Sequence, residues 1–552
     1  MRYTKLTIFI LFFIFGFVYL NKAVFAQQSD LAQTPPMGWN SWNCFGIEVN
    51  EEKVNAVADY MAENLKKHGW EYVVIDAGWY HPPTLITRHW STDDPPQSLD
   101  SYGRLLPDTV KFPSAAGGKG FKPLADYVHS KGLKFGIHIM RGIPWNAYEN
   151  DLPLKNTSYT AKDIGDTDNV CQWAKVCVGI DMDHPAGQQY YNTIFEMYAE
   201  WGVDYVKVDD VAREFHSEDI IAMNKAIENS GRPMVLSLSP GPSQIEHAGF
   251  FKEQANLYRI SNDFWDHWKF VKRNMEYCVQ WYPHITPGHW PDADMLTFGK
   301  LRVTGGDDWV ASLLEDSYDN IGNEYSRFTD TEKQTVMTLW SIFRSPLMFG
   351  GYLPETKEYT LSLIQNDSVI KVNQNSTNNR LVDQSGYRYV WSADEPGTDN
   401  KYVALFNLYD SKQTVEVGWS DLDIQENHKV KCVWKDSVYG VYNQKFVKEL
   451  EPHASLLLKF LPTDEDITMI HEHQKGNINV FPNPCDKQLI VRFEEFKERQ
   501  VKILDLHGTL LFEKYSPLTK QEVFDVRKLK PGLYVVKIIG DGHARAKHFI
   551  KH

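Results

Sequence analysis

Two adjacent carboxylates follow an apolar, strand-like run in the segment WGVDYVKVDD. Side chains alternate between the two faces of a strand, so Lys207 and Asp209 share one face, and Asp210 lies on the other with two valines. We expect the valines to pack against helices and the first pair to point inward. A nearby ammonium group favours an ionised carboxylate. Asp209 is therefore predicted to be a nucleophile, and Asp210 a loop or cap residue.

Polar residues recur where other predicted strands end. Asp76 ends VVID, His138 ends FGIH, and Ser237 and Ser239 share a face of LSLS. In RISND, Arg259, Ser261 and Asp263 share a face if the extended form persists. One polar strand end is usually a cap or a satisfied core group. Five such ends, however, fit the carboxyl-end rim where barrel enzymes build their active sites.

Two carboxylates with different tasks suit glycoside hydrolysis. A retaining enzyme uses one as nucleophile and one as acid/base about 5–5.5 Å away, whereas an inverting enzyme spaces them about 6.5–9.5 Å apart. We assign the nucleophile to Asp209 and the acid/base to Asp263. Arg259 is a natural donor to a sugar hydroxyl.

The surrounding elements predict the scaffold. Between about residues 34 and 370, short β-rich runs alternate with helical stretches, which indicates parallel β-α units and a (β/α)8 TIM barrel over 31–375. A doubly wound open sheet is the alternative, but no glycine-rich phosphate loop follows the first strand. Closely spaced short strands predict an antiparallel β-sandwich over 378–462, and a small all-β domain follows over 476–552.

Composition and targeting signals limit the classes of molecule that the protein is expected to bind. The 552 residues carry a net charge of −14 and no long basic run beyond the extreme N-terminus, which argues against nucleic acid and an anionic membrane surface. Residues 1–26 are predicted to be a secretory signal peptide cleaved after Ala26. The alternative, an uncleaved anchor, would need an apolar run of about 20 residues. No later run is comparable, so we expect no transmembrane segment after cleavage.

The six cysteines are scattered, and neither a CxxC pair nor a Cys/His cluster suggests zinc. We therefore expect no metal and no organic cofactor. Cys171 and Cys177 are near enough in sequence to form a disulfide in an oxidising compartment.

Eight motifs occur in barrel order and together resemble glycoside hydrolase family 27, the α-galactosidase or melibiase family. They are TPPMGWNSWNCFG (34–46), VVIDAGW (73–79), LKFGIH (133–138), WGVDYVKVDD (201–210), YRISNDFWDHW (258–268), HWPDADML (289–296), LWSIFRSPLMFGG (339–351) and VIKVNQN (369–375). The resemblance implies a retaining double displacement with Asp209 as nucleophile and Asp263 as acid/base. The substrate-binding positions that it implies are Trp42, Asp76, His138, Lys207, Ser239, Arg259 and Asp292. A site-supporting role for Asp292 and Asp294 is an equal alternative.

Three departures from the family pattern bear on the sugar. The family's α-galactosidases usually carry two adjacent Asp where this chain has Asp76 and Ala77, and a tyrosine is common at the position of His138. Ser239 is small where a bulkier side chain usually reads the 2-position. The segments GIHIMRGIP and SLSPG resemble a branch that includes β-L-arabinopyranosidases.

The resemblance implies an exo-glycosidase that releases terminal α-D-galactosyl residues from a glycan. β-L-Arabinopyranosidase and α-N-acetylgalactosaminidase activities are the alternatives, and a catalytically dead sugar-binding barrel is the non-enzyme reading. Both carboxylates that the chemistry needs are present, which argues against the last.

The C-terminal segment resembles the sorting domain of proteins exported by the type IX secretion system, through VFPNP, VKILDLHG, LKPGLYVVKI and the terminal HFIKH. The alternative is a generic Ig-like carbohydrate-binding module. The resemblance implies that the secretion machinery is a partner and that the protein is secreted or displayed at the surface of a Gram-negative bacterium, across the outer membrane.

Overall fold

The computed structural model describes residues 31–83, 96–301, 324–465, 479–492, 499–505, 508–516, 519–540 and 543–552. The predicted signal peptide lies outside these residues. One compact unit contains the described residues up to Val415 together with Lys448–Leu457, and a second contains Glu416–Val447 and the described residues from Leu458 onward. None of the described helices is both long enough and apolar enough to span a bilayer.

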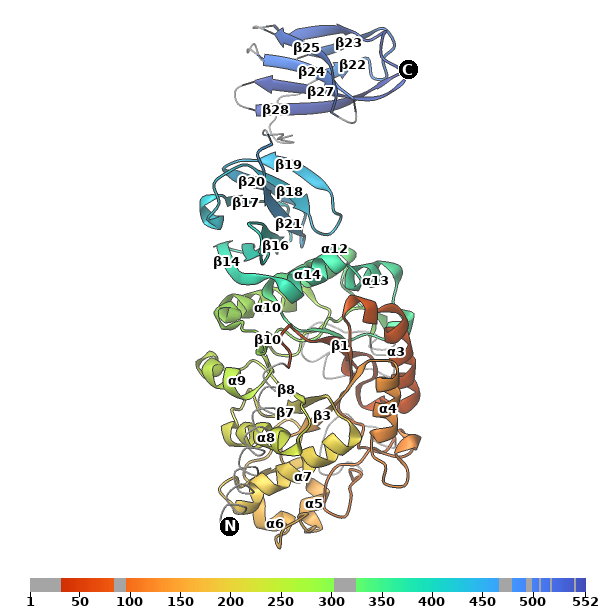
Figure 1. The fold of residues 1–552 in the computed structure, drawn as a ribbon, viewed down its shortest axis with the longest axis vertical. Helices are drawn as coiled ribbons and strands as arrows, with labels where there is room; N and C mark the ends of the chain where they lie inside the picture. The colour runs from red at the N-terminus through yellow and green to blue at the C-terminus, as the bar shows by residue number, and fades with distance from the viewer. Residues whose placement is uncertain are drawn as a thin grey trace, which may run out of the picture. The chain divides into compact units, whose positions relative to one another are not determined.

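The first unit is built on eight parallel strands in the order β10-β9-β8-β7-β3-β2-β1-β13 (Figure 1). They are β1 (Met37–Asn40), β2 (Tyr72–Ile75), β3 (Lys134–Met140), β7 (Tyr205–Asp209), β8 (Val235–Leu238), β9 (Leu257–Arg259), β10 (Trp290–Asp292) and β13 (Leu347–Phe349). A parallel bridge between Leu296 and Phe349 joins the segment that follows β10 to β13, the strand at the other edge of the sheet. The predicted (β/α)8 barrel is therefore confirmed over the open-sheet alternative.

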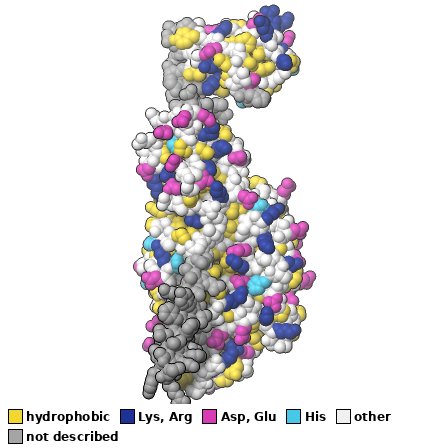
Figure 2. Space-filling view, viewed as in Figure 1, with side chains coloured by type: hydrophobic (Ala, Val, Ile, Leu, Met, Phe, Trp, Pro, Cys, Tyr) yellow, Lys and Arg dark blue, Asp and Glu magenta, His cyan; other side chains and the backbone are white. Residues whose placement is uncertain are grey.

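Helices surround this sheet (Figure 1). The longer ones are α3 (Glu51–Asn64), α4 (Lys122–Ser130), α7 (Pro185–Trp201), α8 (Ser217–Ser230), α10 (Trp268–Trp281), α12 (Asp330–Phe343) and α14 (Asp367–Asn375). Their ends follow from local sequence. Pro185 opens α7 and Gly202 closes it at φ 85°, while Thr329 and Glu332 form a reciprocal capping box on α12. Acidic and basic side chains are interspersed over the face of this unit in Figure 2.

The strand side chains that face the barrel axis form an apolar layer below a polar one. The apolar layer contains Tyr72, Val74, Tyr205, Val235, Leu257, Met295 and Met348. On four of the strands the residue type changes to charged or polar two positions further along, at Asp76, Lys207, Ser237 and Arg259. In the pairing register, Lys207 lies between His138 on β3 and Ser237 on β8. The packed lower layer thus fixes the height at which the polar groups emerge.

The predicted antiparallel β-sandwich is also confirmed. In the first unit, β14 (Thr377–Ser385), β15 (Arg388–Asp394) and β16 (Lys401–Asn407) pair antiparallel. In the second, β18 (His428–Cys432) pairs antiparallel with β19 (Val438–Tyr442) and with Leu458–Pro462, the C-terminal part of β21 (Ser455–Pro462). A further two-stranded sheet joins β17 (Gln413–Gly418) to β20 (Lys445–Leu450).

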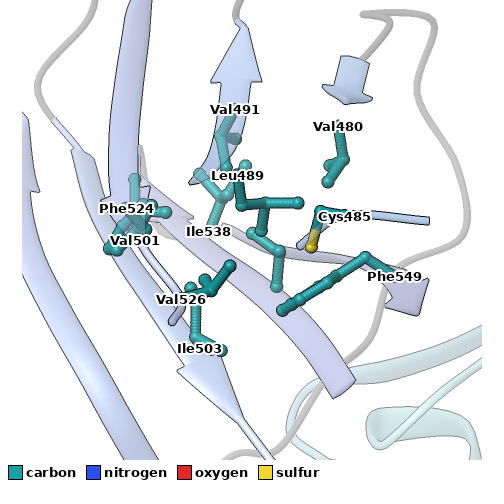
Figure 3. Close-up of a cluster of buried hydrophobic side chains, with 11 residues drawn as sticks. Val480, Cys485, Leu489, Val491, Val501, Ile503, Phe524, Val526, Ile538 and Phe549 are labelled. Carbon is teal, nitrogen blue, oxygen red and sulfur yellow. The ribbon is translucent and has the colours of Figure 1, made fainter. Parts of the chain in front are cut away.

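The described residues of the C-terminal segment are all-β, as predicted, and form one three-stranded and one four-stranded sheet. The first contains β22 (Asn479–Phe481), β23 (Gln488–Arg492) and β26 (Gln521–Asp525), and the second contains β25 (Leu510–Ser516), β24 (Arg499–Leu504), β27 (Gly532–Gly540) and β28 (His543–Lys551). Figure 3 shows the cluster of buried side chains that these sheets share, including Leu489, Val501, Phe524 and Phe549. This segment therefore has a hydrophobic core of its own.

Candidate active site

The buried carboxylate of Asp76 lies at the C-terminal end of β2 and is held by three donors. Its Oδ2 accepts hydrogen bonds from Lys207 Nζ at 2.8 Å and from Asn40 Nδ2 at 2.7 Å, and its Oδ1 accepts from the backbone N of Ala77 at 2.8 Å. Burial lowers the pKa of Lys207, but Asp76 and Asp209 outweigh it and raise that pKa above its ordinary value. Lys207 therefore stays a fixed positive charge inside the barrel.

Asp209 ends β7 on the same inward face as Lys207, as strand alternation predicts. Its Oδ2 lies 2.9 Å from His138 Nε2, and its side chain is 13 % exposed. Burial raises the pKa of Asp209, but Lys207, His138 and Arg259 together hold that pKa well below its ordinary value. An ionised carboxylate only accepts, so His138 Nε2 carries the proton.

The second carboxylate oxygen of Asp209 is different. Oδ1 is buried and has no hydrogen-bond partner among the described residues. A carboxylate oxygen without a protein partner is left to contact water or a bound substrate. The group is thus a candidate for attack on a bound molecule.

Asp210 turns away from this site, as predicted. Its backbone lies at φ 66°, and its buried carboxylate forms an ion pair with Arg141 at 2.9 Å. The two neighbouring carboxylates therefore have separate surroundings.

Asp263 follows β9 and is the most exposed of the candidate carboxylates, with a side chain 38 % accessible. The Arg259 guanidinium donates from Nη2 to Asp263 Oδ1 at 3.0 Å and pairs with Asp294 Oδ2 at 2.9 Å. Arg273 Nη2 donates to the Asp263 carbonyl at 2.9 Å. Arg259, predicted as a hydroxyl donor, lies here between two carboxylates, close enough to Asp209 to lower its pKa.

The carboxylates of Asp292 and Asp294 accept hydrogen bonds from backbone N–H groups of nearby loops. Asp292 Oδ1 accepts from Asp294 N at 2.8 Å, and Asp294 Oδ2 accepts from Phe264 N at 2.7 Å. Burial raises the pKa of both side chains, that of Asp294 to about 6. Since Phe264 directly follows Asp263, Asp294 braces the loop that carries it.

Two further predicted residues lie at the same end of the barrel. Ser239 is buried, and its backbone N donates to Val208 O at 2.8 Å. Trp42 begins the short helix α2 (Trp42–Phe45), and its half-buried side chain packs against the apolar barrel layer. Its backbone N donates to Asn40 Oδ1 at 2.9 Å.

The sequence reasoning missed Asn40 and Arg141. Asn40 is the last residue of β1, so the rule that selected the other strand ends would have found it. Arg141 directly follows β3, but nothing local indicates that its partner lies 69 residues away.

The predicted disulfide is wrong. Cys171 and Cys177 are both free and buried within one small apolar cluster. Burial raises the pKa of the Cys171 thiol above its ordinary value, and the charge of Asp210 raises it further. The thiol therefore lies near a carboxylate and stays protonated.

Three family profiles match the chain. The one described as Alpha galactosidase A matches residues 34–144 and 166–311, and Alpha galactosidase C-terminal beta sandwich domain matches 385–460. The Secretion system C-terminal sorting domain matches 479–552, which confirms the type IX resemblance of the tail.

Individual relatives are similar over the barrel and sandwich. The crystal structure of a family 27 β-L-arabinopyranosidase from Geobacillus stearothermophilus is 43 % identical, covers 80 % of this chain and 99 % of its own, and has a TM-score of 0.74. A putative α-N-acetylgalactosaminidase from Bacillus halodurans is 42 % identical, with coverage of 78 % and 97 % and a TM-score of 0.68. An α-galactosidase from Cyamopsis tetragonoloba is 28 % identical, with coverage of 80 % and 90 %.

Proposed function

Because the chain belongs to glycoside hydrolase family 27, we propose that it is an exo-acting retaining glycosidase with Asp209 as nucleophile and Asp263 as acid/base. One observation carries this proposal above the others. Asp209 is a buried carboxylate kept ionised by Lys207 and His138, and one of its oxygens is left without a hydrogen bond among the described residues.

The reaction takes two steps. In the first, Asp209 bonds to the anomeric carbon as the glycosidic C–O bond breaks, and Asp263 gives its proton to the departing oxygen. In the second, Asp263 takes a proton from water, the water oxygen bonds to the anomeric carbon, and Asp209 leaves as a carboxylate. The greater exposure of Asp263 supports its role, because the attacking water must reach that group in the second step.

The preferred sugar, we propose, is a terminal β-L-arabinopyranosyl residue. The support is the relative that is 43 % identical over nearly its whole length, together with Ala77, which is buried directly after Asp76 and offers no side-chain acceptor. Arabinopyranose is galactose without C6, so a site with one carboxylate fewer loses little by binding it.

Release of terminal α-D-galactosyl residues is the second candidate, favoured by the α-galactosidases that are 28 % identical. A rate comparison on three aryl glycosides decides between them: the β-L-arabinopyranoside, the α-D-galactoside and the α-N-acetylgalactosaminide. The highest kcat/KM is expected on the first. A highest value on either of the others contradicts the substrate proposal and leaves the mechanism intact.

Ala77→Asp tests the cause of the preference. A new carboxylate able to meet a C6 hydroxyl is worth about 1.5–3 kcal/mol, which is roughly a 10- to 100-fold shift in relative kcat/KM toward the galactoside. Ala77→Asn is the matched control for side-chain size without charge, and we expect it to shift the ratio less. An unchanged ratio in Ala77→Asp would show that another residue excludes the C6 group.

The tail supports a proposal about location. A sorting domain at residues 479–552 is expected to pass the protein to the secretion machinery and so to the cell surface or the medium. A chain truncated after about residue 470 should keep its specific activity but stay inside the cell. Surface delivery of the truncated chain would contradict this role.

A further inference from the structure

Asp210 has an unusual backbone conformation directly after the proposed nucleophile. Its φ of 66° lies in the left-handed region, which L-residues other than glycine seldom adopt. Such a conformation costs on the order of 1 kcal/mol and persists only where the surroundings enforce it. A residue that holds Asp210 in this conformation also fixes the direction of the backbone directly after Asp209, the last residue of β7.

Arg141 meets that condition. Its Nε donates to the Asp210 carbonyl at 3.1 Å, and its Nη2 donates to Asp210 Oδ2 at 2.9 Å. Its own backbone N donates to the Asp209 carbonyl at 3.1 Å. Both charged side chains are almost fully buried, at 2 % and 3 % exposure. Arg141 therefore binds the carbonyl groups of Asp209 and Asp210 and the carboxylate of Asp210.

The same guanidinium also reaches the loop between β5 (Gly165–Asp166) and β6 (Cys177–Ile180). Arg141 Nη2 lies 3.2 Å from Asn169 Oδ1 and 3.3 Å from Asn169 O. The Cys171 thiol of that loop lies close enough to the Asp210 carboxylate to help lower its pKa. The ion pair is therefore anchored from a third segment.

Asp209 depends on its backbone for orientation. Among the described residues, its Oδ2 has one hydrogen-bond partner, His138, and its Oδ1, the oxygen proposed to attack, has none. A displacement of about 1 Å at a reacting group can cost about 100-fold in rate. We propose that Arg141 and Asp210 are a positioning pair, which fixes the nucleophile through the main chain without touching substrate. This inference rests on the proposed role of Asp209.

The pair has a counterpart at the opposite end of the same strand, which supplies a matched control. Arg232 forms an ion pair with Asp204 at 2.5 Å and donates to the carbonyls of Val203 at 2.8 Å and Gly202 at 3.1 Å. It also binds a carboxylate and two backbone carbonyls beside β7, but at the end remote from the proposed nucleophile.

The first experiment compares Arg141→Lys and Asp210→Asn with Arg232→Lys in the full chain. In the first two variants we expect kcat to fall about 10- to 100-fold, with KM within a few-fold of wild type. The fall in kcat should be the same for good and poor aryl leaving groups, because both chemical steps use the nucleophile. Arg232→Lys should lower the melting temperature but leave kcat unchanged. If Arg141→Lys fails to fold, Asp210→Asn, which keeps shape and an acceptor oxygen, carries the test. Equal kcat in all three variants would overturn the inference.

The second experiment removes the group that is positioned. In Asp209→Gly, azide should replace the carboxylate by attacking the anomeric carbon of an activated aryl glycoside, so that a glycosyl azide and a phenolate form. Adding Arg141→Lys should leave this azide-dependent rate within about twofold, because no carboxylate remains to be positioned. If Arg141→Lys lowers the azide-dependent rate as much as it lowers kcat in the chain that keeps Asp209, the positioning role is contradicted and the proposed function is not. No azide rescue of Asp209→Gly would contradict the proposed function itself.

Discussion

Strand β7 is flanked by a carboxylate at each end, and the two have opposite surroundings. At the N-terminal end, Asp204 Oδ2 meets His129 Nε2 at 2.7 Å and Phe135 N at 2.8 Å, and Oδ1 meets Arg232 at 2.5 Å. At the C-terminal end, Asp209 Oδ2 meets only His138, and Oδ1 has no partner among the described residues.

The pKa of each group is held below its ordinary value, although by different means. Burial raises the pKa of Asp204, but direct hydrogen bonds from His129 and Phe135 and the charge of Arg232 outweigh it. For Asp209, the charge of Lys207 is the largest opposing influence. A low pKa alone therefore does not distinguish the two ends. The distinction is whether both oxygens are used, since a satisfied carboxylate stabilises the barrel and an unsatisfied one is available for chemistry.

The largest expected effect is on turnover at the C-terminal end. Asp209→Ala removes the proposed covalent intermediate, so kcat should fall by on the order of 10⁴-fold or more. Steady-state rates on an activated aryl glycoside measure this loss. Full activity in Asp209→Ala would contradict the claim that the carboxylate at the C-terminal end of β7 is the catalytic one.

Asp263→Ala should produce a smaller loss that depends on the leaving group. General acid catalysis contributes about 10²- to 10⁴-fold, and it matters most when the departing oxygen is basic. A series of aryl glycosides of increasing leaving-group pKa should give a steeper decline in the variant than in the wild type. Parallel slopes would remove Asp263 from the acid/base role.

Strand alternation predicted much of this site, since it placed Lys207 and Asp209 inward and Asp210 outward, and the contacts with Asp76, His138 and Arg141 agree. The contact between Arg259 and Asp263 was not predicted by the extended segment, because β9 ends at Arg259 and the chain then bends at Ser261 and Asn262. The missing disulfide was not predictable, because pairing depends on Cα separation and Cβ direction rather than sequence distance. Arg141 was missed because its role comes from tertiary neighbours. The domain boundaries proposed from composition remain predictions.

At the N-terminal end, the expected loss is in stability. Asp204→Asn keeps the shape but turns an amide toward donors such as Phe135 N–H, which should cost about 2–3 kcal/mol. Thermal unfolding should show a lower melting temperature, while kcat stays at the wild-type value. A large drop in kcat with no change in melting temperature would mean that this end also serves catalysis.

The last expected effect is on the pH dependence of stability, and it comes from Asp219 on α8, a carboxylate buried without a direct ion pair among the described residues. Tyr191 Oη donates to its Oδ1 at 2.6 Å, and burial raises its pKa to about 6 despite that bond and the charge of Arg141. The folded-state pKa exceeds the unfolded value of about 3.9, so the native state binds the extra proton between these values. Stability from this group is therefore lost as the pH rises from about 4 to about 6.

Asp219→Asn should remove that dependence, which amounts to at most about 3 kcal/mol over the whole pH range. Melting temperatures of the two proteins between pH 4 and pH 7 measure it: relative to the variant, the wild type should lose stability as the pH rises. Parallel curves over this range would show that Asp219 keeps an ordinary pKa.

The most direct measurement locates the covalent bond. A fluorinated, mechanism-based aryl glycoside of the preferred sugar should inactivate the enzyme as the glycosyl–enzyme intermediate accumulates, and peptide mapping by mass spectrometry then identifies the labelled residue. A glycosyl group on Asp209, with Asp210 unmodified in the same peptide, is the result that we predict. Label on Asp210, or turnover with an inverted product anomer and no covalent adduct, would contradict the account.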